Sequence, residues 1–232
     1  MKLPQLEPAV FIRRYKRFLV DVELDDGSVL TVHCPNTGSM RGCLSPGNPV
    51  MLSRSDSPTR KYPHSLEMIQ VEGYWVGINT IRTNHLVREA IENGVIDEFG
   101  EVDDIKAEVK VSEKSRLDFL LNRPNNQLYV EVKNCTLVED GIAMFPDAVT
   151  KRGSKHLREL VSLKHRGYDA AVFFCVQRMD SHEFAPAAHI DSVYADTLAE
   201  AAEAGVMVVA YQASVSPEEI KITHALPVKI NS

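Results

Sequence analysis

Two carboxylates and a lysine within residues 115–134 are the side chains of this sequence best suited to metal chemistry. The segment reads SRLDFLLNRPNNQLYVEVKN, and its two apolar runs flank the polar RPNN, which predicts two antiparallel strands joined by a loop. If Leu121 pairs with Leu128, the same register sets Asp118 directly across from Glu131, with Cβ atoms about 4.5–5.5 Å apart. Two like charges at that separation repel each other, so the pair calls for a compensating positive charge.

A divalent cation is the obvious source of that charge. Mg²⁺ takes one or two carboxylates and completes its shell with water and phosphate oxygens, so Asp118 and Glu131 are predicted ligands of Mg²⁺ or Mn²⁺. Lys133 follows Glu131 by two residues and shares its strand face, which puts a positive charge beside the metal. The pattern Asp-x12-Glu-x-Lys resembles the active-site signature of the restriction-endonuclease-like nucleases, the PD-(D/E)XK superfamily. The alternative is a solvated edge hairpin whose charges discourage strand pairing.

The composition is that of an ordinary soluble protein. The 232 residues, 44% of them hydrophobic and 25% charged, suffice for one large domain or two small ones. No apolar run approaches the roughly 20 residues that span a bilayer, and the first residues lack the apolar core of a secretory signal. We therefore expect a cytoplasmic, bacterial-type protein with no membrane contact. Its scattered cysteines are expected to be reduced and mostly buried: Cys34, Cys43, Cys135 and Cys175.

Charge is distributed unevenly along the chain. The net charge of −6 argues against a generally adhesive nucleic-acid binder. Residues 1–82, however, carry 10 Lys and Arg against 8 Asp and Glu, whereas residues 83–232 carry 16 against 24. The positive end of the molecule is thus its N-terminal part, and the acidic remainder is compatible with a carboxylate metal site.

Residues 1–82 predict a domain made of short strands. Residues 11–24 read as one strand, with Phe18 in its apolar stripe, and Asp25-Asp26-Gly27 makes a good hairpin turn. Loops rich in Gly and Pro separate the later strands. Five strands without a clear helix predict a small Greek-key barrel of the OB-fold type. The expected strands are 11–24, 29–34, 50–53, 65–72 and 74–79.

Basic side chains concentrate in this predicted barrel, with aromatic side chains among them. Barrels that bind single strands combine a positive groove with aromatic rings on which bases stack, so the cluster predicts nucleic-acid contact. A solvated face is an equally good interpretation of the cations, and a core position is favoured for the ring of Phe18. The candidate nucleic-acid-binding residues are Arg13, Arg14, Lys16, Arg17, Arg60 and Lys61.

From residue 83 the sequence alternates between helical and strand-like segments. The helical stripe of 83–93 ends before Gly94 and sets the predicted domain boundary between residues 82 and 83. The result is a mixed α/β domain with helices on both faces of a central mixed sheet. Its segments are a strand at 108–111, the central hairpin continued over 134–144, a helix capped by Thr150 or Ser154, a buried strand at 170–176, a helix at 192–204, a strand at 206–213 and a partly ordered tail from Ser216.

Several long stretches of the chain resemble the sugar fermentation stimulation protein A family. They read RYKRFLVDV, HCPNTGSMRGC, RKYPH, SRLDFLL, YVEVKN, FPDAVTKRGSKHLREL and HIDSVYADTL, and together they span nearly the full length. The resemblance implies an OB-fold at 1–82 followed by a restriction-endonuclease-like domain at 83–232. It further implies DNA binding and a regulatory role in sugar use, in particular of maltose.

The same resemblance assigns roles to residues. Asp118 and Glu131 become metal-ligating carboxylates, and Lys133 becomes the catalytic lysine that stabilises charge at the scissile phosphate. The resemblance also suggests nucleic-acid contacts near a helix start and after a strand: Arg152, Lys155, His156, Gln177 and Arg178. A Mg²⁺-dependent phosphodiesterase acting on single- or double-stranded DNA is expected. A DNA-binding regulator without turnover and an RNA-directed nuclease are the alternatives.

Overall fold

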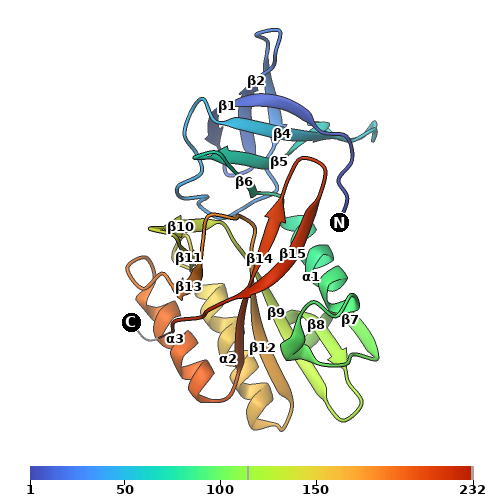
Figure 1. Cartoon of the computed structure of the whole chain (residues 1–232), viewed down its shortest axis with the longest axis vertical. Helices are drawn as coiled ribbons and strands as arrows, with labels where there is room; N and C mark the ends of the chain where they lie inside the picture. The colour runs from blue at the N-terminus through green and yellow to red at the C-terminus, as the bar shows by residue number, and fades with distance from the viewer. Residues whose placement is uncertain (114, 231–232) are drawn as a thin grey trace.

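Strands β1 to β6 form the N-terminal part of the molecule (Figure 1). The computed structural model describes residues 1–113 and 115–230. Neighbouring strands follow the order β3-β2-β1-β4-β5-β6, and an additional pairing of β3 with β5 closes the first five into a barrel. The predicted five-stranded barrel is confirmed, but its first predicted strand is two strands, β1 and β2, and the strand predicted at 74–79, β6, lies beside β5 outside the closed five. The strands are β1 (Glu7–Tyr15), β2 (Leu19–Glu23), β3 (Val29–His33), β4 (Pro49–Arg54), β5 (His64–Val71) and β6 (Tyr74–Gly77).

A tight turn between β1 and β2 contradicts one prediction. Residues 11–24 do not form one strand, because the chain reverses at Lys16 and Arg17, which have φ values of 50° and 62°. Neither residue type favours this left-handed region, since a Cβ atom makes it costly, so the sequence carries no turn signal here. Phe18, predicted to lie in the core, follows this turn and is 48% exposed, whereas Val20 and Val22 are fully buried.

A mixed sheet forms the centre of the remaining chain, as predicted, and it has six strands. Its order is β15-β14-β12-β9-β8-β7, with parallel pairing of β12 to both β9 and β14 and antiparallel pairing elsewhere. The strands are β7 (Asp104–Ser112), β8 (Ser115–Asn122), β9 (Gln127–Cys135), β12 (Asp169–Val176), β14 (Met207–Val215) and β15 (Ile220–Leu226). The helices are α1 (Thr83–Glu92), α2 (Lys151–His165) and α3 (Ser192–Glu203), with 3₁₀ turns η1 (Thr80–Arg82) and η2 (Asp97–Phe99).

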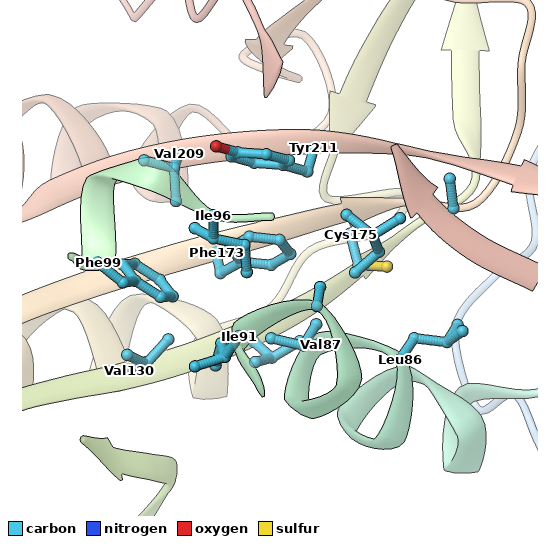
Figure 2. Packing of buried hydrophobic residues seen from close by; sticks show 14 of the residues in the cluster. Leu86, Val87, Ile91, Ile96, Phe99, Val130, Phe173, Cys175, Val209 and Tyr211 are labelled. Carbon is cyan, nitrogen blue, oxygen red and sulfur yellow. The ribbon is translucent and has the colours of Figure 1, made fainter. Parts of the chain in front are cut away.

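The helices cover both faces of this sheet (Figure 1). On one face, Leu86 and Val87 of α1 pack in a cluster with Phe173 of β12 (Figure 2). On the other face, α2 and α3 cover Phe174, because successive residues of a strand point to opposite sides. Met68 of β5 belongs to the first of these clusters, so the barrel and the central sheet share a buried core.

Two predictions for the second half of the chain are wrong. Residues 134–144 do not simply continue the central sheet, because β10 (Leu137–Glu139) and β11 (Ile142–Phe145) form a separate three-stranded sheet with β13 (Glu183–Pro186). Residues 217–230 are not a partly ordered tail, because β15 is an edge strand of the central sheet, and residues 231–232 of the predicted tail lie outside the described residues. Ile220 and Ile222 are buried there, and their alternation with polar residues is the strand signal that the prediction overlooked.

The four cysteines are free and buried, as predicted. Burial raises the pKa of the Cys43 thiol to about 11, which keeps it protonated at neutral pH. None of the helices within 1–113 and 115–230 is both long and apolar enough to cross a membrane.

Candidate metal and nucleic-acid site

Strands β8 and β9 separate beside the predicted acidic pair. Leu121 pairs with Leu128, as predicted, but the ladder ends where Phe119 faces Val130. Beyond that pair β8 continues along β7, while β9 continues along β12. The two strands therefore form a fork, and Asp118 lies at its opening instead of in a cross-strand pair.

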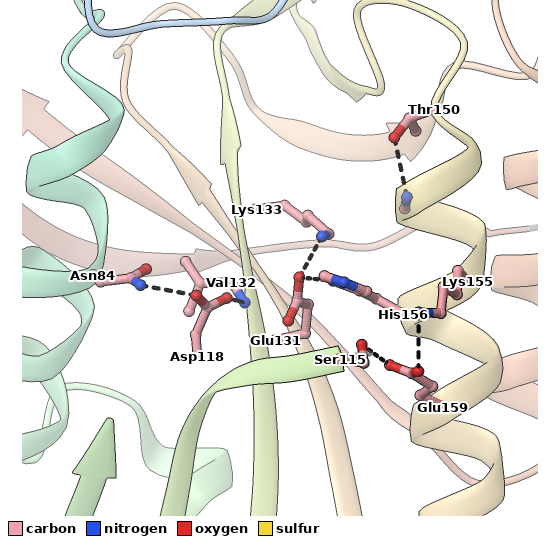
Figure 3. Close-up of polar contacts among 11 residues, drawn as sticks. Asn84, Ser115, Asp118, Glu131, Val132, Lys133, Thr150, Lys155, His156 and Glu159 are labelled. Atoms are coloured by element: carbon pink, nitrogen blue, oxygen red, sulfur yellow. Dashed lines mark hydrogen bonds and ion pairs between the residues drawn. The ribbon is translucent and has the colours of Figure 1, made fainter. Parts of the chain in front are cut away.

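Two hydrogen bonds hold Asp118 at the fork (Figure 3). Its Oδ2 accepts a hydrogen bond of 2.7 Å from the backbone N–H of Val132, the residue that follows Glu131. Its Oδ1 accepts one of 2.8 Å from Nδ2 of Asn84 on α1. An ionised carboxylate offers about four lone-pair sites, so both oxygens can still accept a further positive partner.

Glu131 lies on the face of β9 that α2 covers, and it is 4% exposed. Its Oε1 accepts a hydrogen bond of 2.5 Å from Nζ of Lys133 and also contacts Nδ1 of His156, which reaches across from α2 (Figure 3). Ser115 at the start of β8 binds Glu159 of the same helix. A buried carboxylate is costly unless it is paired, so the contacts with Lys133 and His156 stabilise Glu131 in its ionised form.

The two carboxylates titrate differently. Burial, reinforced by the charge of Glu131, raises the pKa of Asp118 to about 6. Burial also acts to raise the pKa of Glu131, but the hydrogen bond to His156 and the charge of Lys133 outweigh it, so that pKa is lowered. Ionised Asp118 therefore stands beside a second negative charge in a poorly solvated place, which an added cation would relieve.

A cleft of about 970 Å³ joins this fork to the barrel. Residues 36–39 and the β1–β2 turn form its barrel wall, while residues 145–150 and the start of α2 form the opposite wall. Asp118, Glu131 and Lys133 all line the cleft. Cations from both halves of the chain therefore share one cavity with the acidic pair, and the exposed ones are Lys16, Arg17 and Arg152.

Asp147 bridges the two walls of the cleft. Its backbone oxygen accepts a hydrogen bond of 2.6 Å from Oγ of Ser39, and its Oδ2 accepts one of 2.7 Å from the backbone N–H of Met40. A Cβ atom on Gly38 would lie 3.0 Å from both the Asp147 carboxylate and the Asn36 side chain, so this approach favours glycine. These contacts, here named the Asp147 bridge, fix the barrel wall against the opposite wall.

Arg14 supports the turn that presents Lys16 and Arg17. A guanidinium group has five N–H donors, and here they make five hydrogen bonds to backbone oxygens inside the protein. The acceptors are Arg17, which takes two bonds, Asn36, Gly38 and Ser39. Arg14 was a predicted phosphate contact, but its donors are occupied in this way, so it positions the neighbouring cations.

Other candidate nucleic-acid-binding residues lie outside the cleft lining. Arg13 pairs with Asp21 at 2.9 Å and Lys155 pairs with Glu159 at 3.7 Å. Arg60 and Lys61 are exposed on the loop before β5. His156 is 4% exposed and is engaged with Glu131, so it has no surface to offer a phosphate.

Gln177 and Arg178, which follow β12, are 1% and 3% exposed. Nε2 of Gln177 donates to Oγ1 of Thr83 at 3.1 Å and to Asn134, which joins the start of α1 to the end of β9. Nη1 of Arg178 donates to the backbone oxygen of Thr136 at 2.8 Å. Both side chains therefore position residues that line the cleft, and both are too buried to meet a phosphate directly.

Comparison with known proteins accounts for both halves of the chain. A family model described as "SfsA N-terminal OB domain" matches residues 12–78, and one described as "Sugar fermentation stimulation protein RE domain" matches residues 81–219. The chain belongs to the sugar fermentation stimulation protein family. A homolog from Desulfotalea psychrophila is 54% identical, with 97% of this chain and 93% of the relative covered. One from Citrifermentans bemidjiense is 55% identical, with 98% and 99% covered.

A solved structure of the sugar fermentation stimulation protein family has the same fold. It is that of Pyrococcus furiosus SfsA in complex with Ca²⁺, with a TM-score of 0.91 and 29% sequence identity. The similarity covers 99% of this chain and 98% of that one. The predicted fold class is thus confirmed, with an OB-like barrel followed by a restriction-endonuclease-like mixed α/β domain.

Two residues at the site of this family member have no role that the sequence alone predicts. Asn84 binds Asp118, but the helical pattern of α1 identifies only the apolar face of that helix and gives no role to its polar side chains. Asp147 lies 108 residues from Ser39, so its bridging contact is invisible to local spacing. Its position three residues before Thr150, the observed N-cap of α2, indicates only that it lies near a helix N-terminus, a common place for anion binding.

Proposed function

We propose that this protein is a divalent-metal-dependent nuclease that also binds DNA through the cleft between its barrel and its central sheet. The observation that carries the proposal is the fork, which brings Asp118, Glu131 and Lys133 into one cavity with exposed cations. A restriction-endonuclease-like domain in the family model supports the same reaction class. Asp118 and Glu131 are the proposed metal ligands, and Lys133 is the proposed catalytic lysine.

The donor set at the fork fits Mg²⁺ or Mn²⁺. Both are hard cations that prefer oxygen ligands, and Mg²⁺ in particular is held by one or two carboxylates plus water and substrate phosphate. Across the described ranges, no group of three or more His, Cys, Asp or Glu side chains gathers as a complete metal cage. A pair such as Asp118 and Glu131 accordingly suits an ion that is completed by its substrate. The Ca²⁺ complex of the Pyrococcus furiosus relative supports a divalent ion in this family.

Each side chain of the fork has a separate task in this proposal. When bound, the metal would polarise the scissile phosphate and lower the pKa of an attacking water. Lys133 carries three donors, of which one reaches Glu131, so the others remain to stabilise charge on a phosphate oxygen. His156 and Asn84 hold the two carboxylates in place and act only through them.

Substrate phosphates would be met by cations on both walls of the cleft. Lys16 and Arg17 approach from the barrel, and Arg152 approaches from the first turn of α2, where the helix dipole also favours an anion. The proposal keeps the predicted cytoplasmic location, where cellular nucleic acid lies. A regulatory effect on sugar use, including that of maltose, would then act through nucleic acid, because the residues of the cleft suit the phosphate groups of a nucleic acid.

The decisive test is a cleavage assay on labelled single- and double-stranded DNA and RNA, with Mg²⁺, Mn²⁺ or EDTA. The parent should cut at least one substrate in a metal-dependent way, and Lys133→Ala should not. Asp196→Asn, a change at an exposed residue of α3, is the matched control and should behave as the parent. Nucleic-acid binding without cleavage under any condition would leave a DNA-binding regulator, and cleavage confined to RNA would make the protein an RNA-directed nuclease.

A further inference from the structure

We infer that the cleft takes a single strand of nucleic acid and excludes an intact duplex. The inference rests on the proposed function and adds the class of substrate. Three features carry it: the dimensions of the cleft, the side chains at the β1–β2 turn, and the Asp147 bridge.

The volume and depth of the cleft suit one strand. Its volume of about 970 Å³ lies at the upper end of the roughly 300–1,000 Å³ that a single small ligand fills, which leaves room for a few nucleotides of one strand. Glu131 is only 4% exposed, so a phosphate must enter the cleft to reach it. A flexible strand can bend into such a place, whereas the backbone of a duplex is held on a stiff rod.

The β1–β2 turn offers contacts to both phosphates and bases. Lys16 and Arg17 are exposed cations that line the cleft. Phe18, directly after them, is 48% exposed and lies just outside the cleft lining, whereas Tyr15, directly before them, lines the cleft and is partly buried. Cations next to exposed aromatic rings are the combination by which barrels hold single strands, because unpaired bases stack on the rings. The bases of a duplex are already stacked on each other and cannot use Phe18.

The Asp147 bridge fixes the two walls of the cleft against each other. The turn cannot swing away from the opposite wall as a unit, because Arg14 ties it to residues 36–39 and these are bonded to Asp147. Opening the cleft for a duplex would break both bridging hydrogen bonds, one of which is made by a carboxylate. The barrel therefore acts as a fixed wall that limits access to the buried Glu131.

Binding in EDTA tests this inference without cleavage. Fluorescence anisotropy with a labelled single-stranded DNA, a single-stranded RNA and a blunt DNA duplex should show at least tenfold weaker binding of the duplex. Phe18→Ala should weaken single-strand binding about tenfold, whereas Tyr74→Ala, at a 43% exposed tyrosine on β6, should not. The double variant Lys16→Ala/Arg17→Ala should reduce the slope of log affinity against log salt concentration by about 0.7 per lost phosphate contact. Arg166→Ala, at the far end of α2, is the control and should leave that slope unchanged.

The outcomes separate the inference from the proposed function. Equal binding or cleavage of duplex and single strands, or equal losses in the turn variants and their controls, would overturn the inference and leave the nuclease proposal intact. A single-strand preference without cleavage of any substrate would refute the nuclease proposal and support the inference. The DNA and RNA arms show which of the two single strands the cleft prefers.

Discussion

Asp118→Asn is expected to stabilise the metal-free protein at pH 8 by up to about 3 kcal/mol. Burial raises the pKa of Asp118 from 3.8 to about 6, and each pH unit between these values corresponds to about 1.4 kcal/mol. The folded state binds the proton more tightly than the unfolded state does, so ionising Asp118 lowers stability as the pH rises towards 6. Asn carries no charge at any pH. The advantage of the variant should therefore shrink to about 1 kcal/mol at pH 4.5.

The measurement is urea unfolding of both proteins in EDTA at pH 8 and pH 4.5, supported by melting temperatures. For a chain of this size, 3 kcal/mol corresponds to a rise of about 6–12 °C. Mn²⁺ at a hundred times its dissociation constant should then stabilise the parent by about 2.7 kcal/mol and the variant far less. Asp196→Asn controls for the loss of a charge. A variant that is less stable than the parent at pH 8 in EDTA, or a difference that is the same at both pH values, would refute the reasoning.

Three further variants and one control variant probe other contacts of the structure. Lys133→Ala should keep the metal-dependent rise in melting temperature but lose at least about a hundredfold in cleavage rate; loss of the metal effect would count against its assigned role. Arg82→Ala should lower the free energy of unfolding in urea by about 3–5 kcal/mol, because it strips Glu67, 1% exposed, of its bidentate partner. Arg88→Ala removes only an exposed pair within α1 and should cost about 0.5 kcal/mol or less, so equal losses would contradict this view. Asp147→Ala should weaken nucleic-acid binding in anisotropy titrations about tenfold, because a charged hydrogen bond is lost. The metal-dependent rise in melting temperature should stay unchanged. Unaltered binding would argue against the role of the bridge.

Where local pattern dominates, the fold could be predicted from the sequence. The apolar run of β12 and the helical stripes of α2 and α3 are recognisable because burial requires them. The turn at Lys16 and Arg17 was missed, because its left-handed backbone is held by two hydrogen bonds from Arg14 to the Arg17 oxygen and not by turn-forming residue types. The last strand was missed because Ile220 and Ile222 make a short pattern whose meaning depends on the neighbouring β14.

The site was predictable in its residues but not in its geometry. Spacing alone brings out Asp118, Glu131 and Lys133, since one strand face and one hairpin register relate them. The opening of the fork depends on how β8 and β9 pair with their outer neighbours, which no spacing within the hairpin records. The same limit explains His156, a predicted phosphate contact that tertiary packing turns towards Glu131. The assigned roles of these residues, and the division of the chain at residue 82, stay predictions.

The core shared by the barrel and the central sheet limits what isolated halves of this chain can reveal. Met68 is buried in the cluster that α1 forms with the sheet, and Met51 and Trp75 pack against the same cluster. A fragment ending at residue 82 would expose these side chains, each worth about 1.5–3 kcal/mol when fully buried. It would carry an apolar patch prone to self-association. Precipitation of such a fragment would therefore reflect its exposed core residues and not a failure of the barrel to fold. A barrel exchanged between relatives would need a matching α1 to cover the same residues and remain soluble.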